Sequence, residues 1–373
     1  MAFYPKQIID ALSKVRYPGT GKDIVSAGMV DDNIRIEGNR VSFSLVFAKQ
    51  NDPFAKSVIK AAETAILTYV DKTIDVSINA AAKVAVPSPS EAADPLPEVR
   101  NIIAVSSGKG GVGKSTVAAN LSVALSAMGY RVGLLDADIF GPSQPKMFGI
   151  EDARPQMTQA GGSMIEPVER YGVKLLSIGF FVNKGDAVLW RGAMASNALK
   201  QLIMEADWGA LDYFLIDLPP GTSDIHLTIV QTLALTGAVV VTTPQEVALA
   251  DARKGISMFT GEKVNVPVLG LVENMSWFTP AELPENKYYI FGKAGGERLA
   301  EELNIRLLGR IPVVQSVCEG GDSGSPAALD PDSVTGAAFH ALARSLVAAV
   351  ELRNQKIPPT ARVMITHARG ERR

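Results

Sequence analysis

From about residue 100 onward, short apolar runs alternate with amphipathic stretches. The apolar runs predict strands at residues 102–106, 131–136, 173–178, 213–217, 238–243, 268–272 and 307–311. The amphipathic stretches between most of them have the spacing of helices. Strands this apolar are buried on both faces, which indicates an α/β fold with a mostly parallel sheet sandwiched by helices. Ligands of such sheets bind at the carboxyl ends of the strands.

The first 80 residues follow a different pattern, which predicts a small α+β domain in the order helix, strand, strand, helix, strand. Residues 40–48 alternate as a strand, and residues 73–78 supply another. Asp52 as N-cap and Pro53 at the first helical position predict where the second helix begins. The segment contains no Cys and no His, so we expect no catalytic centre there.

Residues 81–99 carry four prolines and predict a semi-extended linker. The predicted organisation is therefore a small domain at 1–80, a linker at 81–99, a large domain at 100–355 and a basic tail at 356–373. A chain of 373 residues is consistent with two or three domains at about 150 residues each.

The overall composition narrows the functional classes. Hydrophobic residues make up 47% of the chain and the formal charge is −2, which argues against a generally basic nucleic-acid binder. The start of the chain lacks the pattern of a signal peptide. The longest uncharged stretch, 227–245, contains Gln231 and Pro244 and predicts a helix followed by a strand rather than a membrane span. We expect a cytoplasmic protein with neither nucleic acid nor membrane as a partner.

A phosphate-binding motif follows the first predicted strand of the large domain and opens a helix. It consists of Gly108, Lys109, Gly110, Gly111, Val112, Gly113, Lys114, Ser115 and Thr116. This arrangement satisfies G-x-x-x-x-G-K-S/T in the strand–loop–helix context of a P-loop NTPase. Backbone N–H groups of the loop are expected to surround the phosphates of ATP. Lys114 should reach the β- and γ-phosphates, Ser115 should bind Mg²⁺, and Thr116 can reach the α-phosphate.

Three carboxylates end two other predicted strands. Asp136 and Asp138 are spaced to share one face toward the phosphates. Asp138 is the candidate for orienting the attacking water, and Asp136 for supporting Mg²⁺ or Lys114; the alternative for each is a loop cap. Asp217 follows four apolar residues in the Walker B pattern and should hold Mg²⁺ through water.

Other polar residues have two open interpretations. Asn274, at the end of a later strand, either recognises adenine or forms an ordinary turn. Arg191 either contacts a partner's phosphates or forms a surface ion pair. Either Ser223 or Asp224 caps the helix after the Walker B strand.

Together, the segments GKGGVGKST, LLDADIFGPS, WRG, LDYFLIDLPPGTSD, ENM and IPVVQSVCEGGDSGSP resemble the Mrp/ApbC iron–sulfur cluster carrier ATPases. This is the deviant Walker class that also contains the MinD and ParA ATPases. The resemblance covers residues 100–350. The N-terminal unit, with Pro18 and residues 23–30, resembles the small iron–sulfur-assembly-associated domain that is often fused to Mrp proteins.

The resemblance implies an ATP-hydrolysing homodimer that delivers clusters to apo iron–sulfur proteins, working with the assembly machinery. It implies that Lys109 is the second P-loop lysine, which reaches the nucleotide of the opposite subunit. The alternative for Lys109 is a solvated surface charge. Smaller departures from the family pattern are Ala193 after WRG and Ser223 in place of the usual Gly.

Cysteine content is the largest departure. The family usually carries C-x-x-C shortly after the Asn-Met stretch, and the motifs of two subunits jointly hold a 4Fe–4S cluster. Here residues 276–289 contain no Cys, and the whole chain contains one, Cys318. A homodimer then offers two thiolates where such a cluster normally needs four. The remaining ligands would come from His226, His340, His367, a carboxylate, a small thiol or a client protein.

Cys318 itself is either a cluster ligand or a small buried hydrophobe. The sequence also leaves a second function open, a MinD/ParA-like positioning or regulatory ATPase without a cluster. That function favours a C-terminal amphipathic membrane helix or a basic patch. The last predicted helix, 333–351, has instead the apolar stripe of a core helix, and Pro358 and Pro359 interrupt the tail. The cysteine count excludes a reductase like the nitrogenase iron protein.

Overall fold

The computed structural model describes residues 4–18, 21–30, 34–47, 52, 54–82, 94–158, 164–182, 192–280, 282–283 and 285–363. Most of the predicted linker, residues 83–93, lies outside this set, as do Arg191, His367 and residues 364–373. The chain divides into two compact units, Met1–Ala92 and Ala93–Arg373.

The N-terminal unit has the predicted order of elements: α1 (Pro5–Leu12), β1 (Arg35–Glu37), β2 (Arg40–Phe47), α2 (Ala55–Tyr69) and β3 (Asp75–Ala82). Its sheet has the order β1-β2-β3; β1 runs antiparallel to β2, and α2 provides the crossover to the parallel β3. Alternate residues of β2 are buried, among them Val41 and Phe43, against a face of α2 that includes Val58 and Ile66.

The predicted start of the second helix is wrong. The helix begins at Ala55 with Phe54 at the N-cap, not at Pro53 with Asp52 as the cap. The Asp52 carboxylate accepts hydrogen bonds from the Phe54 N–H at 2.8 Å and from the Tyr17 hydroxyl at 2.5 Å. Both carboxylate oxygens are therefore hydrogen-bonded to groups that precede the first turn of α2. Asp52 links the residue before this helix to Tyr17, in the segment after α1.

The second unit is built on an eight-stranded sheet, in the order β13-β12-β11-β4-β10-β5-β9-β8. Its strands are β4 (Ile102–Ser107), β5 (Val132–Asp136), β8 (Val168–Arg170), β9 (Val173–Ser177), β10 (Tyr213–Asp217), β11 (Gly237–Thr242), β12 (Val268–Glu273) and β13 (Leu307–Arg310). All seven predicted strands are confirmed, each end to within one residue. The sheet is parallel except for the edge strand β8. Neither β8 nor the small ribbon of β6 (Met157–Thr158) and β7 (Met164–Ile165) was predicted.

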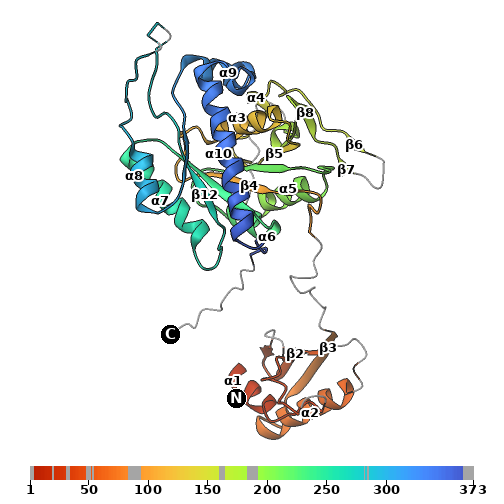
Figure 1. The fold of residues 1–373 in the computed structure, drawn as a ribbon. Coiled ribbons are helices and arrows are strands. Elements are labelled where there is room, and N and C mark those ends of the chain that lie inside the picture. Colours follow the sequence, from red (N-terminus) through yellow and green to blue (C-terminus); the bar gives the residue numbers. More distant parts are fainter. Residues whose placement is uncertain are drawn as a thin grey trace. The chain divides into compact units, whose positions relative to one another are not determined.

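Helices cover both faces of this sheet (Figure 1). They are α3 (Lys114–Ala127), α4 (Gln144–Met147), α5 (Gly192–Met204), α6 (Asp224–Thr232), α7 (Glu246–Thr260), α8 (Gly295–Glu302), α9 (Gln315–Ser323) and α10 (Val334–Lys356). Two 3₁₀ turns complete the unit, η1 (Ile178–Phe180) and η2 (Ala327–Leu329). Among the helices described, none combines the length and the apolar character that crossing a bilayer requires.

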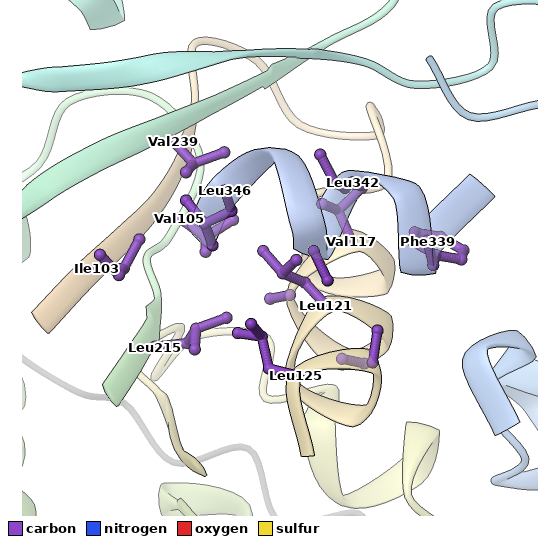
Figure 2. Packing of buried hydrophobic residues seen from close by; sticks show 14 of the residues in the cluster. Ile103, Val105, Val117, Leu121, Leu125, Leu215, Val239, Phe339, Leu342 and Leu346 are labelled. Atoms are coloured by element: carbon purple, nitrogen blue, oxygen red, sulfur yellow. The ribbon is translucent and has the colours of Figure 1, made fainter. Parts of the chain in front are cut away.

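The alternation of side chains along β4 shows why both faces are apolar. Ile103 and Val105 pack into a core with α3 and α10, whereas Ile102 and Ala104 face the opposite core under α5 and α6. On the first face, Leu342 and its neighbours on α10 lie against a stripe of α3 (Figure 2). The last helix is therefore a core helix, as predicted, although it extends to Lys356.

The strand register brings the chemistry to one edge. Asp217 of β10 lies opposite Asp136 of β5, and also opposite Val105 of β4, two residues before the end of that strand. Parallel strands place their carboxyl ends at the same edge of the sheet. The P-loop and the predicted carboxylates therefore meet there.

Candidate active site

The P-loop connects β4 to α3, and its glycines are required by the backbone. Gly111 and Gly113 have φ angles of 80° and 79°, which residues with a side chain rarely adopt. A Cβ on Gly113 would also lie 2.3 Å from the amide nitrogen of Asn274. That nitrogen donates a hydrogen bond to the Val112 carbonyl at 2.8 Å, which fixes the loop from the end of β12.

A cavity of about 230 Å³ lies against this loop. Its lining residues are Ser107, Lys109, Gly110, Gly111, Gly113, Lys114, Ser115, Thr116, Asp138, Ser143, Met147 and Pro220. Most of these residues belong to the P-loop and the start of α3, and four of them carry hydroxyl groups. Such a wall offers N–H and O–H donors beside one buried lysine, which suits phosphate oxygens.

Lys114 is buried at the floor of the site and forms an ion pair with Asp217. Its ammonium also lies 3.2 Å from the Ser115 hydroxyl. A buried ion pair is maintained only when its charges are well compensated. Phosphate oxygens in the adjoining cavity would compete with Asp217 for the same ammonium.

Asp136 is fully buried and has three donors on one oxygen. They are the backbone N–H groups of Ser143 and Gln144, each at 3.1 Å, and the Ser177 hydroxyl at 2.9 Å. Burial raises the pKa of the Asp136 carboxyl, and the neighbouring Asp217 raises it further. A cation placed between these carboxylates would relieve their repulsion.

Asp138 is half-buried and lines the cavity. Burial raises its pKa as well, and nearby Lys114 acts in the opposite direction. One carboxylate oxygen accepts the Gly141 N–H at 3.2 Å, so Asp138 also caps its loop. The capping alternative and an orientation toward the cavity are both present.

The residues at this site fit a magnesium ion with phosphates. Ser115, Asp136 and Asp217 supply hydroxyl and carboxylate oxygens, the donors that Mg²⁺ prefers. In addition, the Ser143 hydroxyl and the Gln144 side-chain carbonyl are buried without a hydrogen-bond partner among the described residues. Ser143 lines the cavity, so a bound ligand can supply the partner that its hydroxyl lacks.

Comparison with models of known families shows which family the chain belongs to. The family model described as NUBPL iron-transfer P-loop NTPase matches residues 98–347. The chain belongs to this family. A second model, described as iron–sulfur cluster assembly protein, matches residues 5–80 of the same chain.

Relatives extend the match over both units. An iron–sulfur cluster carrier protein of Synechocystis is 41% identical over 351 residues, covering 92% of this chain and 97% of the relative. A protein of the same name from Escherichia coli is 49% identical over 261 residues, or 70% of this chain and 69% of the relative. Among solved structures, a nucleotide-binding protein of Archaeoglobus fulgidus in complex with ADP is 37% identical, with a TM-score of 0.57 over 66% of this chain and 95% of that one.

The sequence analysis missed several residues at this site, among them Ser143, Ser177 and Gln144. Gln144 makes the most contacts of these three. Its side-chain nitrogen donates to the Asp217 carboxylate at 2.8 Å and to the Ser115 carbonyl at 3.1 Å. A glutamine eight residues after Asp136 matches no catalytic motif. Its position depends on the turn between β5 and α4, which returns the Gln144 backbone N–H to the Asp136 carboxylate.

The structure decides some of the interpretations that the sequence left open for other residues, and not others. Ser223 is the N-cap of α6, with its backbone N–H donating to His226 Nδ1 at 3.2 Å. The Asn274 amide nitrogen is engaged by the P-loop, so adenine recognition by this residue stays a prediction. Lys109 is exposed at the rim of the cavity. Arg191 lies outside the described residues.

Cys318 is exposed on α9. The alternative that it packs as a small buried hydrophobe is therefore wrong; α9 lies on the outside of the unit and turns this position to solvent. His226 is buried, and His340 Nε2 lies 3.0 Å from the Ala328 carbonyl oxygen. In the part of the chain that the structure describes, no three His, Cys, Asp or Glu residues form a group able to hold a metal ion.

Proposed function

We propose that the chain is an ATP-dependent iron–sulfur cluster carrier that helps to mature apoproteins. The observation that carries the proposal is the assembly of Lys114, Ser115, Asp136 and Asp217 at one edge of the sheet, in a chain 41% identical to a carrier protein over nearly its full length. The family match and the ADP complex of the Archaeoglobus relative support ATP as the nucleotide.

The proposed roles follow from the positions. Lys114 leaves its pair with Asp217 to bind the β- and γ-phosphates, while P-loop N–H groups bind the remaining oxygens. Ser115 and Asp217 would hold Mg²⁺, supported by Asp136; the ion neutralises phosphate charge when bound. Asp138 lines the same cavity and would orient the attacking water by accepting its hydrogen bond.

Lys109 supports a nucleotide-linked homodimer. Its side chain is exposed at the mouth of the cavity. An exposed lysine gains little from its own surroundings, but it gains much from a polyphosphate presented by a second subunit. ATP then favours the closed dimer because it binds that form more tightly.

The cluster is cargo in this proposal. Two copies of the chain bring two thiols, both Cys318, and a 4Fe–4S cluster normally takes four. The missing ligands would come from a client's own cysteines, a small thiol, or an oxygen or nitrogen donor. Cluster binding should consequently be weak and transient. The N-terminal unit, matched by the assembly-protein model, would meet the assembly machinery and clients in the cytoplasm.

The test is cluster transfer under strict anaerobiosis. Chain loaded with iron and sulfide is mixed with an apo-ferredoxin, and recovery of the ferredoxin's visible absorbance is followed with and without Mg·ATP. The unaltered chain should accelerate recovery in an ATP-dependent way, and Lys114→Ala should not. Lys200→Ala, which removes an exposed lysine from α5, is the matched control. Equal transfer by Lys114→Ala and the unaltered chain would refute the ATP-dependent function.

A further inference from the structure

Gln144 touches three parts of the nucleotide site from the start of α4. Its side-chain nitrogen donates to Asp217 and to the Ser115 carbonyl, and its backbone N–H donates to Asp136. The residue has no solvent exposure. One residue therefore joins the P-loop to both strand-end carboxylates.

The acceptor end of the same side chain is unused. Gln144 Oε1 is buried without a hydrogen-bond partner among the described residues, as is the hydroxyl of the adjacent Ser143. A buried polar oxygen without a partner is unfavourable. Ser143 lines the phosphate cavity, so a bound ligand, or water held by Mg²⁺, can donate directly to its hydroxyl. Gln144 does not line the cavity, so its Oε1 gains such a donor only if the side chain turns toward the ligand.

Contacts continue from α4 to the helix that carries Cys318. Helix α4 packs against α9. Just beyond them the two backbones meet without side chains between, because a Cβ on Gly324 would lie 2.3 Å from the Gly149 Cα. The Tyr171 hydroxyl donates to the Gly324 carbonyl at 2.8 Å and holds this end of α9 in place. A displacement of α4 therefore cannot be absorbed by flexible side chains there.

We propose that Gln144 is a positioning residue that couples occupancy of the nucleotide site to α9, and thereby to the surroundings of Cys318. The proposal rests on the proposed function, because it assumes that nucleotide and Mg²⁺ bind at the P-loop. It assigns to Gln144 the step by which ATP binding or hydrolysis alters how the chain's single thiol meets the cluster.

The coupling has a direct electrostatic cause. Asp217 binds Lys114 and Gln144 at the same time. Phosphates attract the lysine ammonium, and Mg²⁺ with its waters attracts the carboxylate, so both partners of Asp217 change when ligand binds. Gln144 then loses or rearranges its hydrogen bond to Asp217. Because Gln144 is the first residue of the four-residue helix α4, a shift of its side chain is carried into that helix. Ligand binding can move an equilibrium only through such a difference in contacts.

The single cysteine makes the test specific. An aromatic disulfide reagent reports the reactivity of this thiol alone. The Cys318 thiolate attacks its disulfide, forms a mixed disulfide with one half and releases the other half as one coloured aromatic thiolate. Labelling rates are measured with no addition, with ADP, and with ADP and Mg²⁺, each at saturation established by calorimetry. In the unaltered chain Mg·ADP should change the rate by about fivefold or more, the lower end of ordinary coupling between two sites.

Gln144→Leu removes the donor and the acceptor at nearly constant volume, and it should bring the rates with and without Mg·ADP together. Gln144→Met serves the same purpose if the leucine variant does not fold, because its unbranched chain follows the glutamine path. Gln201→Leu, at an exposed position of α5, should respond as the unaltered chain does. A nucleotide response that survives in the Gln144 variants would overturn the role of this residue.

The outcomes for the unaltered chain separate the two proposals. Calorimetric binding of ADP without any change in Cys318 labelling would overturn the coupling and leave the nucleotide site intact. Absence of ADP binding in the unaltered chain would instead overturn the proposed function.

Discussion

Replacing Asn274 by alanine separates two roles for this residue. In the structure its amide donates to the Val112 carbonyl, and both groups are buried. Removal of the donor leaves the carbonyl unpaired, at a cost of about 1–3 kcal/mol. If half of a 2 kcal/mol cost is already present in the ligand-free fold, the melting temperature falls by about 2 °C for a unit of this size. The other 1 kcal/mol is then lost only when phosphate binds, and it weakens phosphate binding by about fivefold, since 1.4 kcal/mol corresponds to tenfold.

The assay is titration calorimetry of the Asn274→Ala variant with ADP, GDP and pyrophosphate. A residue that braces the P-loop should weaken all three ligands by the same factor, because it acts on the phosphate cradle. A residue that recognises adenine should weaken ADP alone. Asn197→Ala, at an exposed position of α5, controls for loss of an asparagine. Loss confined to ADP, with unchanged affinity for pyrophosphate and an unchanged melting temperature, would refute the bracing role.

Further predictions concern the lysines, the cysteine and one histidine. Lys114→Ala should abolish Mg·ATP binding in calorimetry, whereas Lys109→Ala should bind ATP as a monomer but lose turnover; normal turnover there would remove the basis for a lysine acting across the dimer. Reconstitution should give substoichiometric, chelator-sensitive iron and sulfide, and one stable cluster per dimer in both the unaltered chain and Cys318→Ser would show that other ligands exist. Burial lowers the pKa of His226 to about 4 from 6.5. The folded chain therefore binds fewer protons than the unfolded chain below pH 6.5. The contribution of His226 to the free energy of unfolding is complete above pH 6.5, and it should fall by up to about 3 kcal/mol as the pH drops to 4. His226→Gln keeps an acceptor at the third helical position and should flatten urea-unfolding stability over this range; an unchanged pH dependence would exclude His226 as its source.

Sequence reasoning succeeded where the signal is local. The apolar strands and the P-loop are each encoded by a few consecutive residues, so β4 and Gly113 could be predicted without knowledge of the fold. Gln144 was missed because its role depends on two contacts far apart in sequence, with Ser115 and Asp217. The start of α2 was misplaced because the Asp52 carboxylate binds the Tyr17 hydroxyl as well as the Phe54 N–H, and a contact with a residue 35 positions away is not visible in the local sequence. Exposure of Cys318 depends on where α9 packs, which no local pattern encodes.

The strand order has a consequence for how the protein is made. Strand β4 is the first of its sheet to leave the ribosome, yet it lies between β10 and β11. Its buried apolar residues therefore have no strand partner until about residue 217 has been synthesised, and α3 lacks its cover until α10 follows. Pairing over such separations is slow, because the loop must close before any contact forms. The N-terminal sheet closes by Ala82, so that unit can fold while the NTPase unit is still emerging. During this interval the apolar side chains of β4 lack the partner strands that later bury them, which leaves this segment of the nascent chain open to aggregation.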